Sequence, residues 1–233
     1  EPRVRWDGGA IAFAARTSAD TPLRLYELDL ATDRCAPIDT QRATDRDGDV
    51  LVHDLDPAYA ADGSIVFAST RGDAQGRATR TPARLQPNAD LYVLSPDRAS
   101  VRQLTFLLNQ ELAPGFLANG QVIYTVEKRE LDFHVLALRR QNLDGGDYHP
   151  LYASRTSLGF DVAHDVSVLP NGNGLFLASA LGAPDGAGSV LSFNRSLGPD
   201  QEERGLSERG YFPSSLRHLA SALHGGRGLY RSP

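Results

Sequence analysis

Short, almost wholly apolar stretches recur along the chain, and each follows a pair of turn residues. The pairs are Gly-Gly, Asp-Gly or Asn-Gly, and the last two strongly signal a β-hairpin because both central residues of a type I′ turn need positive φ. Continuous apolarity, rather than alternation, is expected for strands that are covered on both faces. The stretches that follow the turns are Ala10–Phe13, Ile65–Ala68, Val122–Val126 and Leu175–Ala178.

The hairpin belongs to a longer unit that occurs four times. Its turn glycines are Gly9, Gly63, Gly120 and Gly172, which gives steps of 54, 57 and 52 residues. In each unit we expect a short strand before the turn and a third apolar strand after the buried one. A weaker outer strand comes last, and polar residues such as Arg102 and Gln103 suit an exposed edge. Four antiparallel strands repeated about every 40–50 residues are typical of β-propeller blades.

The sequence therefore predicts an all-β protein, a β-propeller of four-stranded blades. The alternatives are a β-sandwich, which has no reason to repeat one motif in register, and a β-solenoid, whose coils are shorter than these units. We expect one propeller domain or a fragment of one over residues 1–233. An irregular rim segment is expected at 200–227, with a short helix over 214–223. The four predicted blades cover about residues 3–40, 55–105, 112–153 and 164–213.

The second unit resembles the TolB-type propeller repeat almost throughout. It carries Tyr59, Asp62-Gly63, Ile65, Phe67, Ser69, Arg71, Asp90-Leu91-Tyr92-Val93 and Arg102-Gln103-Leu104-Thr105. The other units look like degenerate copies, and the resemblance covers most of residues 3–195. TolB-like propellers usually have six blades. The resemblance thus implies that missing sequence, a partner chain or an unusual four-bladed ring closes the propeller.

Both ends of the chain strengthen this expectation. The sequence contains no methionine and starts at Glu1, which indicates processing or excision from a longer protein. The last residues, 228–233, look like a strand that begins rather than a domain that ends. The resemblance also extends to large bacterial envelope proteins with such repeats, including the propeller subunit of hydrazine synthase. It implies a periplasmic or extracellular location.

Three functions are compatible with this pattern. The first is a non-catalytic binding or scaffold module with a protein partner. The second is a propeller domain of a larger periplasmic metalloenzyme or oxidoreductase complex, similar to hydrazine synthase. The third is a propeller gate on a hydrolase, as in prolyl oligopeptidases, but it needs an α/β domain that this sequence does not contain. Enzymatic activity of this chain alone is the less favoured interpretation.

Composition removes several other functions. A net charge of −5 and a pI near 5.7 argue against broad nucleic-acid binding, which usually needs a basic face. No run of about 18 apolar residues predicts a membrane span. Cys35 is the single cysteine, so neither an internal disulfide nor a haem-attachment motif can form within the chain. No Gly-x-Ser-x-Gly elbow is present to seat a nucleophilic serine.

Ionisable residues precede the turn at equivalent points of three units, where propellers place ligands at the channel mouth. Imidazole and carboxylate groups brought together there could hold a divalent metal or a polar ligand. Alternatively, these side chains cap strand ends and bond to neighbouring backbone, as aspartate often does in turns. The candidates are His53, Asp54 and Asp56 in the second unit, Glu111 in the third, and His164 and Asp165 in the fourth.

A second, weaker metal candidate is the acidic run Asp45, Asp47 and Asp49. Alternating carboxylates can bind calcium through oxygen ligands. However, Gly48 stands at the fourth position of this run, whereas the helix-loop-helix calcium loop needs its glycine at the sixth. A solvated acidic turn is therefore the favoured interpretation. We predict no cofactor, with calcium or zinc as the metals to consider.

Overall fold

The structure is a computed structural model that describes residues 2–72, 88–106, 110–130, 133–152, 162–180, 187–194 and 217–219. Side chains are described throughout these ranges except at 127–130, 133–136, 152 and 217–218. The chain divides into two compact units. Unit 1 contains Glu1–Pro114 with Leu143–Gly145, and unit 2 contains Gly115–Asn142 with Gly146–Pro233.

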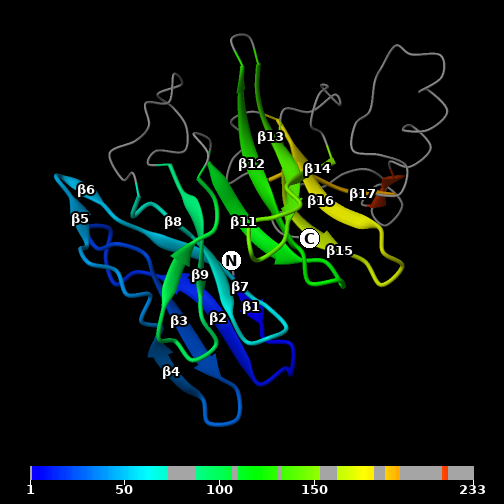
Figure 1. Ribbon diagram of the computed structural model, residues 1–233. Coiled ribbons are helices and arrows are strands. Elements are labelled where there is room, and N and C mark those ends of the chain that lie inside the picture. The colour runs from blue at the N-terminus through cyan, green and yellow to red at the C-terminus, as the bar shows by residue number, and fades with distance from the viewer. Residues whose placement is uncertain are drawn as a thin grey trace, which may run out of the picture. The chain divides into compact units, whose positions relative to one another are not determined.

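Unit 1 contains two four-stranded antiparallel blades, in which neighbouring strands follow chain order (Figure 1). Blade 1 consists of β1 (Arg3–Val4), β2 (Ala10–Ala15), β3 (Arg24–Asp29) and β4 (Arg34–Pro37). Blade 2 consists of β7 (Asp54–Tyr59), β8 (Ile65–Ser69), β9 (Asp90–Leu94) and β10 (Val101–Gln103). A small hairpin of β5 (Arg46–Asp47) and β6 (Val50–Leu51) lies in the connection between them.

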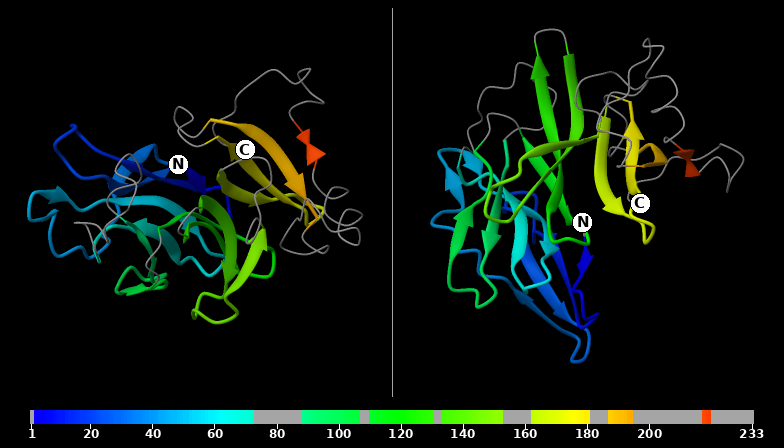
Figure 2. Two further views of the ribbon diagram at one scale, coloured as in Figure 1. Left: turned by 90° about the horizontal axis from the view of Figure 1, so that it is seen from above. Right: turned by 45° about the vertical axis from the view of Figure 1, so that its right-hand side comes forward.

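The two blades of unit 1 pack face to face, with blade 1 in blue and blade 2 in cyan to green (Figure 2). Blade 1 contributes Ala12 and Leu25 to the shared core. Blade 2 contributes large apolar side chains from β7, β8 and β9, of which Phe67 is fully buried. All five residues of β8 are buried, which agrees with the predicted covering of both faces of this strand. Truncation of Phe67 to alanine is expected to cost about 3–5 kcal/mol.

Unit 2 contains most of blade 3 and all described parts of blade 4. Blade 3 consists of β11 (Glu111–Phe116, which begins in unit 1), β12 (Val122–Glu130), β13 (Phe133–Gln141) and β14 (His149–Tyr152). Blade 4 consists of β15 (Val162–Val168), β16 (Gly174–Ser179), β17 (Ser189–Phe193) and β18 (Arg217–His218). One parallel backbone pair, Leu136 with Val162, joins the two blades into an eight-stranded sheet.

The innermost strands of blades 2, 3 and 4 share one backbone irregularity. Seven residues before the turn glycine, Asp56, Ala113 and Asp165 adopt positive φ values of 50°, 49° and 52°. The pairing register of β7 shifts at this point, between Leu55 and Ala58, and that of β15 shifts between His164 and Ser167. A β-bulge bends a strand and re-aims its side chains. Blades 2, 3 and 4 therefore share not only their strand order but also the backbone conformation of this residue.

Proline protects the outer edge of blade 1. The Ile38 amide donates to the Leu25 carbonyl, and in an antiparallel ladder only alternate residues bond to the same neighbour. The nitrogen of Pro37 therefore faces away from β3, where a free N–H could have recruited another strand. Proline on an edge strand removes that donor.

The predicted all-β propeller fold is confirmed, with four blade units of the expected strand order. The predicted helix over 214–223 has only Arg217–Leu219 among the described residues. There Arg217–His218 form β18 against β17, while Leu219 has helical backbone. The other residues of that range and the predicted terminal strand at 228–233 lie outside the described residues. No helix among the described residues has the length and apolar character needed to cross a membrane.

Candidate functional site

Asp54, at the start of β7, is the most completely buried of the predicted site residues in blade 2. Its side chain is 1% exposed. One carboxylate oxygen accepts hydrogen bonds from Ser69 Oγ at 2.6 Å and Arg71 Nη2 at 3.0 Å. The other accepts one from Thr40 Oγ1 at 2.6 Å. Arg42 Nη1 lies 3.7 Å from that second oxygen.

The arginines beside Asp54 are themselves held by blade 2 and by the connection before it. Arg71 stacks over the rings of Phe67 and Tyr92, with its guanidinium carbon 5.1 Å and 4.9 Å from their centroids. The Arg42 side chain is 2% exposed, and burial lowers its pKa despite the opposing charge of Asp54. A buried carboxylate with this set of donors stabilises its surroundings and has little capacity for a ligand.

His53 and Asp56 also bond to nearby backbone. The Leu23 amide donates to His53 Nδ1 at 3.0 Å, so this nitrogen carries no proton and Nε2 does. Burial, followed by the charges of Arg16 and Arg42, lowers the pKa of His53. Asp56 accepts a hydrogen bond from the Ala113 amide at 3.2 Å and thereby links the innermost strands of blades 2 and 3.

Glu111 occupies in blade 3 the position that Asp54 occupies in blade 2, nine residues before the turn glycine. It is fully buried, and Thr105 Oγ1 donates to its Oε2 at 3.2 Å. Its amide donates to the Ala89 carbonyl at 2.8 Å. Like Asp54, Glu111 therefore takes part in the attachment of its strand to the preceding blade.

In blade 4, His164 and Asp165 form a hydrogen-bonded line with Ser179. Asp165 Oδ2 lies 2.7 Å from His164 Nδ1, and His164 Nε2 lies 3.1 Å from Ser179 Oγ. A carboxylate only accepts, so Nδ1 carries the proton, and in the neutral ring Ser179 donates to Nε2. Ser179 is 3% exposed, and a Cβ at Gly188 would lie 2.6 Å from its hydroxyl oxygen. The hydroxyl is buried, and the line ties β15 to β16.

The predicted residues thus divide between the two units, with His53, Asp54, Asp56 and Glu111 in unit 1 and His164 and Asp165 in unit 2. Within the described part of the chain, no three His, Cys, Asp or Glu side chains form a group that could hold a metal ion. The acidic run forms the start and the turn of the β5–β6 hairpin. Asp45 directly precedes β5, and Gly48 lies in the turn with a φ of 57°. Its Asp45 carboxylate is bound by Arg24 at 2.5 Å and Arg42 at 2.9 Å.

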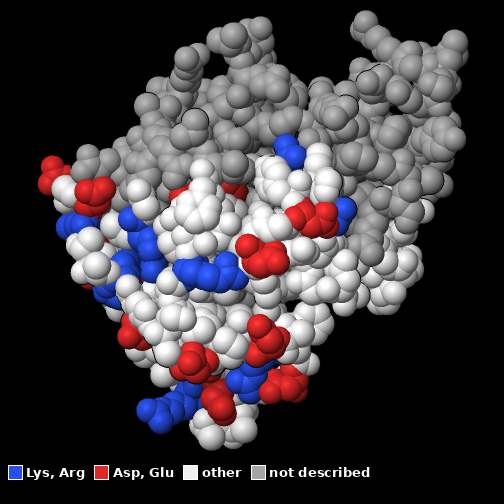
Figure 3. All heavy atoms as spheres, in the orientation of Figure 1, with Lys and Arg blue, Asp and Glu red and all other residues white. Residues whose placement is uncertain are grey.

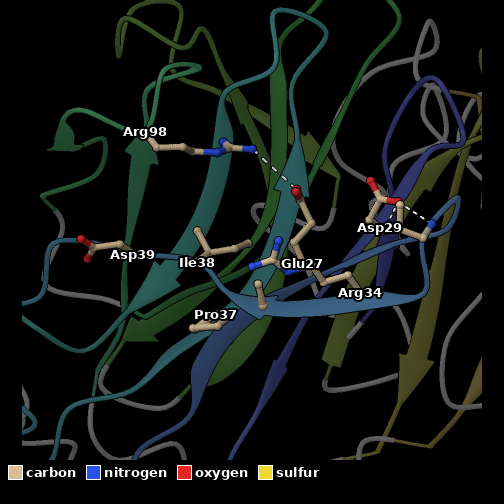
Figure 4. Close-up of a pocket in the computed structure, with 9 residues that line it drawn as sticks. Glu27, Asp29, Arg34, Pro37, Ile38, Asp39 and Arg98 are labelled. Atoms are coloured by element: carbon tan, nitrogen blue, oxygen red, sulfur yellow. Dashed lines mark hydrogen bonds and ion pairs between the residues drawn. The ribbon is translucent and has the colours of Figure 1, made fainter.

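A pocket of about 480 Å³ lies within unit 1, between β3 and β4 of blade 1 and a turn of blade 2 (Figure 4). Basic and acidic side chains intermingle over the described surface of the face drawn in Figure 3, and the pocket has the same mixed character. Ala36, Pro37, Ile38 and Thr32 form the less polar part of its wall. Its charged residues are Glu27, Asp29, Asp39, Arg34 and Arg98. We call it the rim pocket.

A tight turn places Arg98 in the rim pocket. Arg98 has a φ of 61°, and its amide donates to the Ser95 carbonyl at 3.0 Å. Asp97 fixes the turn by accepting from Ser95 Oγ at 2.5 Å and from the Ala99 amide at 3.0 Å. The hydrogen bond from Ser95 is also the main cause of the lowered pKa of Asp97. The Arg98 side chain reaches Glu27 at 3.6 Å and the Gly63 carbonyl at 3.2 Å.

Arg34 is the cation of the rim pocket that has capacity to bind a ligand. Its cross-strand neighbour on β3 is Asp29. Asp29 Oδ1 already accepts hydrogen bonds from the Ala31 amide, the Thr32 amide and the Thr32 hydroxyl, at 3.0, 2.9 and 2.8 Å. The hydroxyl bond is the main cause of the lowered pKa of Asp29. No described residue forms an ion pair or a hydrogen bond with the Arg34 side chain.

Solved structures share the fold of this chain at low sequence identity. Hydrazine synthase from Kuenenia stuttgartiensis matches 99% of the chain at 14% identity, with a TM-score of 0.70. TolB from Acinetobacter baumannii matches 83% at 19% identity, with a TM-score of 0.54. The fold is a TolB-like β-propeller. A puromycin-hydrolyzing peptidase from Mycobacterium tuberculosis contains a similar portion, which matches 94% of the chain at 14% identity and a TM-score of 0.54.

The chain spans only part of each of these three structures. It covers 33% of the hydrazine synthase chain, 40% of the TolB chain and 28% of the peptidase chain. No protein-family model matches it, and no curated protein matches it significantly in sequence. At these sequence identities the structural similarity establishes the fold. It does not establish an activity, which has to be argued from the site itself.

The rim pocket is not predictable from the sequence. Its residues come from separate strands and from a turn about 60 positions further along the chain. One signal was present, because Arg34 and Asp29 flank a tight turn and their side chains would be expected to pair. Only the structure shows that Thr32 and the turn amides bind Asp29 instead.

Proposed function

We propose that the chain is a non-catalytic propeller module that binds a small polar ligand in the rim pocket. The observation that carries the proposal is a contrast within unit 1. Asp54, the buried ionisable group at the inner end of β7, is bound by four side chains of its own protein. Arg34 in the rim pocket has no partner among the described residues. Concave sites with a few convergent polar groups are the usual places for ligands.

The proposal includes a bacterial envelope or extracellular setting, with further blades supplied by the remainder of a longer chain or by a protein partner. The resemblance to TolB-like propellers supports the setting. The coverage of 33% and 40% of two similar propeller-containing chains supports the presence of further blades. The module would then act as a scaffold as well as a binding platform.

The test is a thermal-shift screen of the purified chain against a chemically diverse library of small polar compounds, repeated with Arg34→Ala. Hits that raise the melting temperature of the parent protein and lose that effect in Arg34→Ala support the proposal. Absence of any hit, or hits that stabilise both proteins equally, would contradict it. Because Arg34 is exposed and has no partner among the described residues, its replacement should shift the melting temperature without ligand by no more than about 2 °C, since exposed substitutions change stability by less than about 0.5 kcal/mol.

A second candidate is a propeller domain of a larger periplasmic metalloenzyme or oxidoreductase complex. The match of hydrazine synthase to 99% of the chain, with a TM-score of 0.70, favours it. Among the described residues, no group of His, Cys, Asp or Glu side chains could hold a metal ion, so whether the chain itself binds a metal has to be measured. Elemental analysis of the purified chain tests this point. Stoichiometric iron, zinc or calcium that survives dialysis would favour the second candidate over the first.

A further inference from the structure

Building on the proposed function, we infer that the rim pocket recognises a short peptide with free termini. The peptide carboxylate would bind Arg34, and its ammonium group would bind the carboxylate side of the pocket, chiefly Asp39. One apolar side chain would rest on Ile38 and Pro37. Three properties of the rim pocket support this ligand: it has charged side chains of both signs, one of these side chains has no partner among the described residues, and its lining contains no aromatic side chain.

Arg34 defines the carboxylate end of the site. It projects from β4, and Figure 4 shows its guanidinium reaching between Glu27 and Ile38. Arginine presents N–H donors in a planar fork that matches a carboxylate, and such charge-assisted bonds are among the strongest in proteins. Arg98 lies in the same pocket but is engaged by Glu27 and the Gly63 carbonyl. It therefore strengthens the positive potential, while Arg34 makes the contact.

Asp39 defines the ammonium end. Of the three carboxylates in the pocket, Asp29 accepts three hydrogen bonds on one oxygen, and Glu27 accepts one from Tyr59 at 2.5 Å beside Arg98. Asp39 accepts one described bond, from the Gln41 amide at 2.8 Å. It has the most capacity left for a cationic donor. In Figure 4, Ile38 lies between the Asp39 carboxylate and the Arg34 guanidinium, where the middle of a peptide would pass.

The other common ligand classes fit this wall less well. Three carboxylates against two guanidinium groups oppose a phosphate or another strongly anionic ligand. The lining contains no aromatic side chain, so it offers neither a stacking platform for a base or sugar nor a cage for quaternary ammonium. A volume of about 480 Å³ is in the usual range for ligands larger than a single amino acid. A zwitterionic peptide satisfies both signs of charge at once.

The experiment is isothermal titration calorimetry of the full chain with the tripeptide Ala-Leu-Ala. The same peptide with an amidated C-terminus tests the carboxylate contact, and an N-acetylated form tests the ammonium contact. We expect the free peptide to bind, and each blocked form to bind at least tenfold more weakly, because a charge-assisted contact is lost. Raising the salt concentration should weaken binding, since exposed charges are screened.

Two matched variants locate the contact. Arg34→Ala should weaken binding of Ala-Leu-Ala at least tenfold. Arg102→Ala should leave it unchanged, because Arg102 is an exposed arginine on the outer strand of blade 2 that does not line the pocket. Thermal unfolding of both variants confirms that they are folded. Loss in both variants, or in neither, would overturn the inference.

The outcomes also separate this inference from the proposed function. Affinity that is indifferent to blocking either terminus, or absence of peptide binding, overturns the peptide assignment. If compounds of another class still stabilise the protein in an Arg34-dependent manner, the binding module stands with a different ligand. If neither peptides nor library compounds bind, both proposals fail.

Discussion

Asp54 shows how one carboxylate can hold two segments of the chain together. Thr40 and Arg42 reach it from the connection after blade 1, while Ser69 and Arg71 reach it from β8 and the residues after it. Arg71 also donates to the Thr40 carbonyl at 2.8 Å. The wall of the rim pocket ends at Asp39, so this buried network anchors the chain directly beside the pocket.

Replacement of Asp54 by asparagine should strongly destabilise unit 1. Asparagine keeps the size of the side chain but leaves Arg42 and Arg71 without their buried counter-ion. Removal of one partner from a buried ion pair typically costs about 3–5 kcal/mol. Urea denaturation followed by circular dichroism measures the loss. Asp49→Asn, at an exposed hairpin position, is the control and should change stability by less than about 0.5 kcal/mol. A loss below about 1 kcal/mol for Asp54→Asn would show that the network contributes little.

His53 should make stability depend on pH. Burial lowers its pKa in the folded protein below the value of 6.5 that it has when exposed. Below about pH 6.5 the unfolded chain therefore binds a proton that the folded chain does not. The contribution of His53 to stability is complete above that pH and is lost as pH falls toward the folded pKa, where protonation of Nδ1 breaks the bond from the Leu23 amide.

His53→Asn keeps an acceptor near the Leu23 amide and removes the titration. The free energy of unfolding, measured by urea titration between pH 5 and pH 7.5, should fall less on acidification in this variant than in the parent. Carboxylates titrate in both proteins, so the difference between the two curves isolates His53. Parallel curves would mean that His53 does not couple folding to protons.

At the scale of elements, a glycine with positive φ forms the turn between the first two strands of each blade. Gly63, Gly120 and Gly172 have φ values of 88°, 85° and 82°, whereas Gly9 is not among the residues with positive φ. In blade 1 the preceding Gly8, at 73°, takes this role. The Asp-Gly and Asn-Gly pairs thus predicted the positions of the hairpins correctly, but the predicted type I′ turn is wrong. That turn needs positive φ at both central residues, and Asp62, Asn119 and Asn171 are not among the residues with positive φ.

Gly63→Ala should destabilise the protein by about 1–2 kcal/mol, because alanine at this φ places its Cβ too close to the backbone. The nearest atom to an added Cβ, Pro96 Cβ, is 3.7 Å away, so the cost comes from the backbone and not from a clash. Gly63→Asn should cost less, since asparagine tolerates left-handed conformations better. Thermal unfolding of the two variants gives the comparison. Equal losses would place the cost in packing and not in φ.

Strand order and approximate bounds of the blades were predictable because each depends on a few neighbouring residues. The first strand of blade 2 begins at Asp54, slightly earlier than its apolar residues suggest. Asp54 and Leu55 pair with β8 before the irregularity at Asp56, and Ala58 and Tyr59 pair with β8 after it. The short β18 was not predicted. Its pairing depends on the free edge of β17, about 25 positions earlier in the chain, and not on its own sequence.

At the scale of the whole molecule, the ionisable residues of the repeat were identified from sequence, but their partners were not. His53, Asp54 and Asp56 stand out because of residue type and position, while Thr40, Arg42 and Arg71 reach them only through tertiary packing. The rim pocket has the opposite character. Nothing in the sequence distinguishes its charged residues from other surface residues. They form a pocket only because the Ser95–Ser100 turn lies across from β4 in the folded protein.

The position of a bound peptide tests the account most directly. Protein-observed NMR of the full chain, labelled with nitrogen-15 and titrated with Ala-Leu-Ala, reports which backbone amides shift. A peptide in the rim pocket should shift the amides of Arg34–Ala36, Ile38 and Asp39 and those of the turn around Arg98. Shifts confined to the inner strand ends, around His53–Asp56, Glu111 or His164–Asp165, would contradict it and would return the binding site to the channel mouth.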